Sequence, residues 1–225
     1  MRRSHISKRP WLSLSLVGAL GLAACGGGGG DDANEGEADG AQSLTIESTA
    51  EFDGGTRRDN STDTASAAEV PVVGDGTGIG AAATVYNGLW SFDLASVPPG
   101  AQVTTATLFL VQVGWVGDPQ GSFALARVDH VNIGNTFPAT ASGVAALTLD
   151  FAQIADIATN GVKQVDVTAQ VIADLDAGRT RSSYRMRMPF STDNDGSNDW
   201  CIMSDAERAT DASQLPRIVI EYTIP

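Results

Sequence analysis

Apolar and polar residues alternate along most of the chain after residue 42, in short runs that turn residues separate. Runs of this kind, rich in Val, Ile, Thr and aromatic residues, are typical of half-buried β-strands. A turn is most evident at Pro98, Pro99 and Gly100, because proline fixes φ and glycine then frees it. The pattern predicts an all-β sandwich or barrel, with strands in 43–49, 68–76, 83–94, 101–115, 122–131, 145–151, 163–168, 183–190, 199–204 and 216–224.

Two stretches carry helical spacing instead. In 168–178, two apolar residues lie four positions apart, Thr168 can cap the first turn and Gly178 can end the helix. In 150–161, with Asp150 as a possible N-cap, the apolar residues at helical spacing are Phe151, Ile154, Ile157 and Ala158. The sequence therefore predicts one or two short helices that cross an end or a face of the sandwich.

The N-terminus has the form of an export signal. A basic start at residues 2–9 precedes an apolar run at 11–22 that is too short to span a bilayer comfortably. The following Leu22-Ala23-Ala24-Cys25 resembles the lipobox of bacterial lipoproteins, in which the signal is removed before the cysteine and the cysteine is lipidated. Residues 1–24 are predicted to be a lipoprotein signal peptide and Cys25 the lipidated residue. An ordinary signal peptide with a coincidental cysteine is the alternative.

A tether follows the predicted lipid. Five glycines at 26–30 and a polar, acidic stretch at 31–42 lack any apolar period, and glycine loses much entropy when it is ordered. A flexible segment of this length reaches about 20–25 Å. Residues 25–42 are thus expected to hold one domain, residues 43–225, above a membrane. A glycine rather than an aspartate after Cys25 resembles lipoproteins of the outer membrane, so we expect the outer membrane or the cell surface.

Charge and cysteine content restrict the function. Four of the 14 basic residues lie in the signal, so ten remain against 27 acidic residues and the net charge of the processed chain is −17. A strongly acidic domain does not suit nucleic acid, which attracts a basic surface. Cys201 is the only thiol left beside a lipidated Cys25, so no internal disulfide is expected. A buried core position for Cys201 is favoured over a reactive thiol.

Three blocks of the chain resemble one family. LWSFDLASVPPGAQVTTATLFLV (89–111), QVDVTAQVIADLDAG (164–178) and SDAERATDASQLPRIVIEYT (204–223) are similar to segments of the DNRLRE-type domain, which overlaps the family-96 carbohydrate-binding modules. The resemblance implies a jelly-roll-like antiparallel β-sandwich and leaves the ligand open. Residues 43–80 match the family poorly, and Trp90 stands where an aliphatic residue is usual.

Catalytic chemistry has little support in the sequence. His130 is the only histidine after the signal and has no nucleophile motif beside it, so a Ser-His-Asp arrangement or a His-rich zinc site is not indicated. No pair of carboxylates stands out as a glycosidase pair. The protein is therefore predicted not to be an enzyme, and His130 to be an ordinary strand residue.

The most polar cluster is STDNDGSNDW, residues 191–200. Asp193, Asp195 and Asp199 flank Gly196 there, and alternating oxygen ligands around a tight bend are what calcium requires. The same residue types also form common turns. Two interpretations of this segment therefore remain: a calcium site formed by the three aspartates, or a solvated hairpin loop.

A stripe of arginines is the second polar feature. Arg185 and Arg187 share one face of the strand 183–190, and the other two members of the stripe, Arg179 and Arg181, have the same parity. Acidic residues on neighbouring strands can pair with these guanidinium groups. Alternatively the stripe is a ligand face for an acidic polymer such as a polyuronate, because the guanidinium fork matches carboxylates.

The strand 101–115 carries apolar residues on both faces. By the family pattern Ala106, Leu108 and Leu110 face the core, as Trp90 does on the preceding strand. The other face then shows the apolar row Phe109, Val111, Val113 and Trp115, where a solvated strand would carry polar residues. A helix or long loop covers this row, or it forms a stacking platform with Trp115 at its end.

These features together predict a non-catalytic binding module at the envelope or cell surface. The expected partners are a polysaccharide, for which an acidic polymer is one option, and a membrane, which the lipid anchor contacts. Nucleic acid is not expected as a partner. The alternative is a structural or adhesion lipoprotein that contacts another envelope protein and has no glycan ligand. Calcium is the one cofactor that the sequence suggests.

Overall fold

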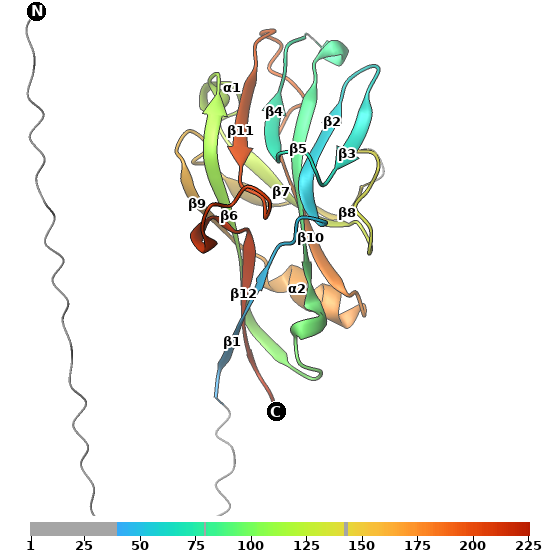
Figure 1. Cartoon of the computed structure of the whole chain (residues 1–225), viewed down its shortest axis with the longest axis vertical. Coiled ribbons are helices and arrows are strands. Elements are labelled where there is room, and N and C mark those ends of the chain that lie inside the picture. The colour runs from blue at the N-terminus through green and yellow to red at the C-terminus, as the bar shows by residue number, and fades with distance from the viewer. Residues whose placement is uncertain (1–39, 79, 142–143) are drawn as a thin grey trace, which may run out of the picture. The chain divides into compact units, whose positions relative to one another are not determined.

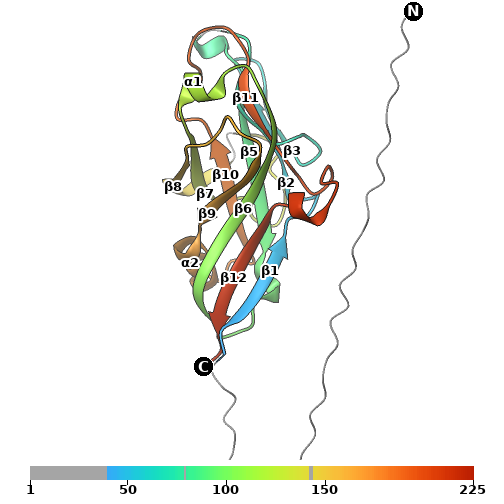
Figure 2. The same ribbon diagram turned by 90° about the vertical axis from the view of Figure 1, so that its left-hand side faces the viewer.

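The strands form one curled antiparallel sheet whose two halves face each other (Figures 1 and 2). This computed structural model describes residues 40–78, 80–141 and 144–225; the predicted signal, Cys25 and most of the tether lie outside the described residues. Over the described part every strand pairing is antiparallel. The expected all-β, sandwich-like class is confirmed.

The described residues contain twelve strands, two α-helices and three short 3-10 turns. The strands are β1 (Gln42–Glu47), β2 (Asp53–Arg58), β3 (Asp63–Ser66), β4 (Val72–Asp75), β5 (Val85–Asp93), β6 (Gln102–Val116), β7 (Ala126–Asn132), β8 (Ala145–Ile154), β9 (Gly161–Asp166), β10 (Arg181–Arg187), β11 (Asp199–Met203) and β12 (Arg217–Thr223). The helices are α1 (Pro119–Phe123) and α2 (Thr168–Asp176), and the 3-10 turns are Gly80–Ala82, Leu94–Ser96 and Ala212–Gln214.

The long strand β6 organises one half of the sandwich. Its first part pairs with β12, which in turn pairs with β1, and its last part pairs with β11. On its other edge β6 pairs with β9. The second half contains β3, β2, β5, β10, β7 and β8 in that order. Pairing of β11 with β4, and of β4 with β5, joins the two halves at one end.

The core lies between the halves and follows the period-2 alternation of the strands. Trp90 and Phe92 of β5 face it, as do Ala106, Leu108 and Leu110 of β6, so these predicted core positions are confirmed. Burying each large apolar side chain contributes about 1.5–3 kcal/mol. Other members of the same cluster include Tyr184, Met186, Met203, Ile218 and Ile220.

Gly88 makes room for the largest of these side chains. A Cβ atom at Gly88 would lie 2.3 Å from the Trp90 ring, which is closer than atoms of a packed core approach. A glycine two residues before Trp90 therefore leaves room for the indole, whose Nε1 donates a 3.4 Å hydrogen bond to the Ser204 carbonyl oxygen.

One predicted helix is confirmed and the other is wrong. Helix α2 begins at Thr168 and ends two residues before Gly178, although the side chain of Asp166, not that of Thr168, accepts the first-turn N–H. The stretch 150–161 is not helical, because its first half belongs to β8 and pairs with β7. An irregularity in that pairing, with Asp150 at φ 51°, displaces the alternation and produces spacing that imitates a helix.

Strands β2 and β3 were not expected, since DGGTRR and DTAS show no apolar alternation. They form because β5 and β3 both pair with β2, so tertiary pairing outweighs weak local propensity. Helix α2 packs against β6 and β10. Across the described ranges no helix has the length and apolar character needed to cross a membrane.

Candidate functional site

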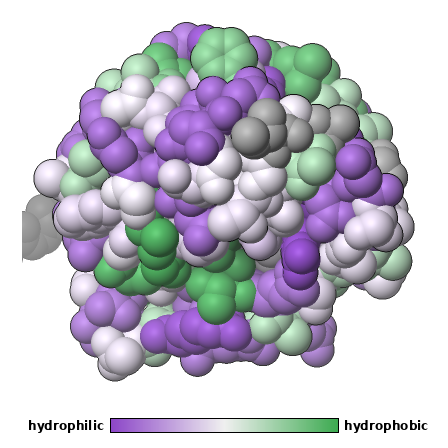
Figure 3. Space-filling view, turned by 90° about the horizontal axis from the view of Figure 1, so that it is seen from above, coloured by the Kyte–Doolittle hydropathy of each residue, from purple (hydrophilic) through white to green (hydrophobic). Residues whose placement is uncertain are grey.

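The polar groups of interest gather where β4, β5 and β11 join the two halves. In Figure 1 this end is uppermost, and Figure 3 looks onto it. Hydrophilic and neutral residues cover most of that surface, with small hydrophobic patches between them. Strand β1, which follows the tether in the sequence, begins at the opposite end of the domain (Figures 1 and 2).

Arg185 and Arg187 extend from β10 on the face opposite to the buried Tyr184 and Met186. Both converge on Asp129 of the neighbouring strand β7. Arg185 donates to Asp129 Oδ2 through Nε at 2.9 Å and Nη2 at 2.6 Å, and Arg187 donates through Nε at 2.9 Å. These charge-assisted bonds link β10 to β7.

Asp129 is fully buried, yet it is well supplied with donors. Its Oδ1 accepts the backbone N–H of Asp150 at 2.9 Å, and Asp150 in turn pairs through its carboxylate with Arg187. Burial opposes ionisation of Asp129, but the hydrogen bonds from Arg187, from the Asp150 backbone and from Arg185 outweigh burial and hold the pKa of Asp129 below its usual range. The hydrogen bonds thus favour the charged form of this carboxylate.

Arg179 and Arg181 do not continue the stripe as free groups. Arg179 Nη1 lies 3.0 Å from Oδ1 of the buried Asp174, whose Oδ2 lies 2.9 Å from His130 Nε2. Arg181 donates to the hydroxyl and the carbonyl oxygen of Ser91 at 2.9 and 2.7 Å. Its guanidinium also stacks 3.6 Å above the Phe52 ring centroid. The structure gives both side chains internal partners.

A cleft of about 280 Å³ opens beside the Arg185–Arg187 pair. Arg58 reaches it from β2 and Asn87 from β5, and Phe190, which is 66% exposed, lies at its border. The remaining lining residues are Val85, Ala141, Arg185, Arg187, Met188, Pro189 and Ser191. A smaller cavity of about 240 Å³ shares Arg58, Val85 and Ser191 with it, so the hollow continues along the strand ends.

Three guanidinium groups line the cleft, those of Arg58, Arg185 and Arg187. Arg185 and Arg187 are balanced by Asp129 and Asp150. Arg58 is exposed and lies opposite Asp63 in the pairing of β2 with β3, and Asp63 Oδ1 accepts the N–H of Ala141, which lines the cleft. A guanidinium group beside a polar amide and an exposed ring can bind an anion and an apolar sugar face.

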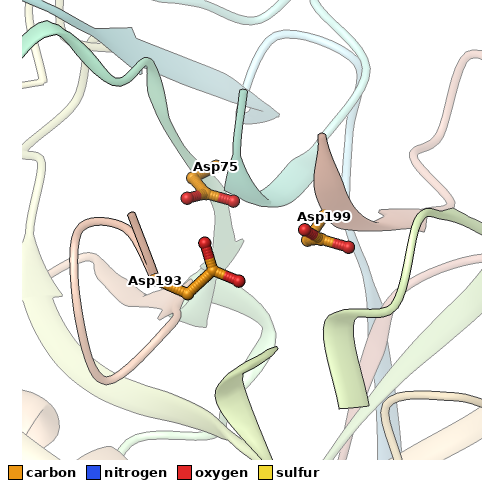
Figure 4. Close-up of side chains that lie close together, drawn as sticks. All are labelled: Asp75, Asp193 and Asp199. Atoms are coloured by element: carbon orange, nitrogen blue, oxygen red, sulfur yellow. The ribbon is translucent and has the colours of Figure 1, made fainter. Parts of the chain in front are cut away.

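The aspartates of 191–200 take two different places. Asp193 and Asp199 converge with Asp75, which ends β4, so that one carboxylate oxygen from each lies within 4.8 Å of the others (Figure 4). Asp195 is exposed and shapes the loop: its Oδ1 accepts the Ser197 N–H at 2.6 Å, and its own N–H donates to Asp193 Oδ1 at 3.0 Å. Sequence reasoning missed Asp75, although an Asp-Gly pair after an apolar run marks a strand end.

Glycine permits the close approach of Asp199 to its neighbours. Gly117 adopts φ +70°, and a Cβ there would lie 2.0 Å from the Asn198 carbonyl oxygen and 2.2 Å from Asp199 Oδ1. The following backbone N–H, that of Asp118, donates to Asp199 Oδ1. Residue 117 is therefore restricted to glycine by the packing of this site.

Two amide side chains join the loops around the aspartates. Asn198 Oδ1 accepts the Thr77 N–H and Asn194 Oδ1 accepts the Gly80 N–H, both at 2.9 Å. The loop that precedes β11 and the loop that follows β4 are thus one hydrogen-bonded unit. Because Gly80 and Ser191 also line the smaller cavity, this unit borders the arginine cleft.

Trp115 lies outside the cleft, on β6, and is 46% exposed. Of its apolar row, Val111 is buried and the ring of Phe109 lies under the Arg217 guanidinium, 4.6 Å from centroid to Cζ. Val113 remains 42% exposed. The row is therefore covered at one end and open at the end that carries Trp115.

His130 and Cys201 are both in the interior. His130 bonds to Asp174 and stacks on Tyr184, with ring centroids 5.8 Å apart. The Cys201 thiol donates to the Ile157 carbonyl oxygen at 3.2 Å, and burial raises its pKa to about 12. A thiol that stays protonated is a poor nucleophile, so the buried interpretation of Cys201 agrees with its surroundings.

The comparisons with known proteins give no family. No family model matches the chain, and the search of curated proteins finds no match either. The resemblance to the DNRLRE-type domain therefore stays a prediction, and the site has to be interpreted from its own geometry.

Proposed function

We propose that this protein is a non-catalytic module that binds an acidic polysaccharide, held at the outer membrane or cell surface by a lipid on Cys25. The observation that carries the proposal is the cleft lined by Arg58, Arg185 and Arg187 in a chain of strongly acidic composition. Three of the few basic residues line this one cleft. Solubility does not require basic residues to cluster in this way.

The cleft offers the contacts that such a ligand needs. Arg58 supplies a fork for a carboxylate or sulfate, Asn87 supplies an amide, and Phe190 offers a ring for an apolar sugar face. Arg185 and Arg187 are already fixed by Asp129, so they would present their remaining N–H groups at little entropic cost.

The net negative charge does not prevent such binding. Charges further than about 8 Å are screened at physiological salt, whereas close guanidinium contacts persist. A long phosphate backbone is a different case, because it would meet the acidic surface along its whole length. The cleft is lined by Arg58 at the end of β2 and Val85 at the start of β5. These strand ends lie away from the start of β1 (Figure 1), a suitable place for a tethered module to meet a polymer.

A second candidate is a structural or adhesion lipoprotein. It is favoured by the exposed apolar side chains around the end of β6, since such groups often mark a protein contact. Those with more than a third of their surface exposed are Val113, Trp115, Val116 and Val162. In this case an envelope protein, and not a glycan, is the partner.

A glycan array probed with the purified protein tests the first candidate. Binding to polyuronates or sulfated glycans, and not to neutral ones, is the expected result. Arg58→Ala should weaken that binding at least about tenfold, because a charge-assisted hydrogen bond is lost. Arg57→Ala is the matched control: it removes the same charge from a neighbouring residue that pairs with Asp59 and does not line the cleft.

Three results would contradict the proposal. The wild-type protein could ignore acidic glycans, both arginine variants could bind equally weakly, or incubation could release reducing sugar and show a hydrolase. The anchor is tested separately: Cys25→Ser should abolish lipid labelling and move the protein out of the membrane fraction. Wild-type protein that is already free of the membrane and unlabelled would refute the lipoprotein interpretation.

A further inference from the structure

Two carboxylates face each other across one strand pair. In the antiparallel pairing of β4 with β11, Asp75 lies directly opposite Asp199, which places their side chains close together. Like charges at directly opposed positions destabilise a sheet. Asp193, from the loop before β11, brings a third carboxylate to the same place (Figure 4). The arrangement concentrates negative charge where the fold alone gives no reason for it.

Two oxygens of this group are buried without a hydrogen-bond donor. Asp75 is 1% exposed and Asp199 is 3% exposed, and Asp75 Oδ1 and Asp199 Oδ2 have no partner. A buried polar atom without a partner costs about 1–3 kcal/mol, and more when it is charged. Native proteins rarely keep such atoms unless a ligand, an ion or water satisfies them.

The surrounding protein supplies donors but no positive charge. Asp118 N–H bonds Asp199, and the Ser122 hydroxyl and the Asp195 N–H bond Asp193 and lower its pKa. Among residues 40–225, as far as they are described, no Lys, Arg or His lies within ion-pairing distance of the three carboxylates. Three other buried carboxylates, those of Asp129, Asp174 and Asp205, do pair with guanidinium groups.

We propose that Asp75, Asp193 and Asp199 bind a divalent cation, calcium. Calcium prefers hard oxygen ligands, accepts carboxylates together with backbone carbonyls, and tolerates the irregular geometry that loops provide. Magnesium demands a stricter octahedral arrangement and loses its water reluctantly. The ion would join the end of β4 to the loop before β11, and it would relieve the repulsion between opposed carboxylates.

The site differs from a continuous calcium loop in one respect that an experiment can detect. Asp75 is essential and Asp195 is dispensable, although Asp195 lies between two ligands in the sequence. The proposal is independent of any glycan, because it rests only on the carboxylates and their missing partners.

Thermal unfolding of the purified protein in chelator and in calcium tests the proposal. A ligand that binds only the folded state raises the Tm with its concentration, by about 5–10 °C when calcium exceeds its Kd a hundredfold. The calcium-dependent rise should vanish in Asp75→Asn and Asp199→Asn. Asp195→Asn is the matched control and should keep it. Magnesium at equal concentration should raise the Tm less.

The variants also have to be compared without calcium. In chelator Asp75→Asn should melt no lower than wild type, because an amide removes one of two opposed charges. If that variant does not fold, Asp193→Asn provides the test, since its side chain is less buried. An unchanged wild-type melting curve between chelator and millimolar calcium would overturn the proposal. So would a response that Asp195→Asn abolishes and Asp75→Asn retains.

Discussion

The cluster around Asp129 and the cluster around Asp75 differ in how their charge is balanced. Asp129 is buried and accepts hydrogen bonds from two guanidinium groups and a backbone N–H. Asp75 is almost as buried, has one oxygen without a donor and lies opposite a second carboxylate. Burial raises the pKa of Asp75, and the charges of Asp193 and Asp199 raise it further.

The number of hydrogen-bond partners distinguishes a structural carboxylate such as Asp129 from one such as Asp75, which has an oxygen without a donor. A buried charge with complete partners stabilises one arrangement of the strands, and removing a partner is costly. A buried carboxylate oxygen without a donor can be satisfied by an ion or by water. Arg185 and Arg187 therefore serve the architecture first, whereas the three aspartates would be completed by the proposed cation.

The largest effect should follow from removing the partners of Asp129. Changing both Arg185 and Arg187 to Ala leaves its carboxylate fully buried and unpaired, which should cost about 3–5 kcal/mol of the free energy of unfolding. Denaturant titration measures this loss.

Asp150→Asn gives the matched control, because the carboxylate of Asp150 is 45% exposed at the end of the same network and should contribute less than about 1 kcal/mol. If the double variant kept wild-type stability, the arginines would be free ligand groups and the comparison would fail.

Asp53 is intermediate between Asp129 and Asp75 in its hydrogen-bond partners. Its titration should produce the next largest effect on the free energy of unfolding. Its Oδ2 accepts bonds from the Ser48 hydroxyl and the Ala206 N–H, but its Oδ1 has no donor. Burial, followed by the neighbouring acids Asp205 and Glu207, raises the pKa of Asp53 to about 6 from 3.8, against the opposing hydrogen bonds.

The sign of the pH effect follows from this shift. Between pH 4 and pH 6 the folded state binds more protons than the unfolded state, so the contribution of Asp53 to stability is present at pH 4 and is lost as the pH rises through 6. The loss is on the order of 3 kcal/mol. Unfolding wild type and Asp53→Asn across this range isolates it, because the variant should lack that part of the pH dependence. Parallel profiles would show that Asp53 does not titrate there.

The smallest effects belong to the loop of 191–200. Asp195→Asn should change stability by only a few tenths of a kcal/mol, since the exposed Asp195 carboxylate only caps its own turn. A large loss of stability would mean that Asp195 belongs to the same charged cluster as Asp75. The distinction between the exposed Asp195 and the cluster of Asp75, Asp193 and Asp199 would then be wrong.

Much of the fold follows from local pattern. Alternation located ten of the strands, and parity placed Trp90 in the core and Tyr184 opposite the arginines, because a strand turns successive side chains to opposite faces. The same logic failed at β8, where an irregular pairing near Asp150 broke the period. It also failed at β2, whose glycines and arginines carry no apolar signal.

The candidate site was only half accessible to such reasoning. A run of Asp and Asn residues marked Asp193 and Asp199, and strand parity marked Arg185 and Arg187. No local pattern could associate Asp75 or Arg58 with them, because those residues come from strands that β11 and β5 bring alongside. The structure also shows that Arg185 pairs with the buried Asp129, a contact that strand parity alone does not predict.

The sequence by itself determined the class of fold and, on β5, β6 and β10, the side of the strand that faces the core, whereas export and lipidation stay predictions. Periodicity and short motifs are local properties, and a one-dimensional pattern records them. Only the tertiary structure decided which charges are paired. Pairing depends on strand register between distant segments, and register sets whether a carboxylate meets a guanidinium, as at Asp129, or another carboxylate, as at Asp75.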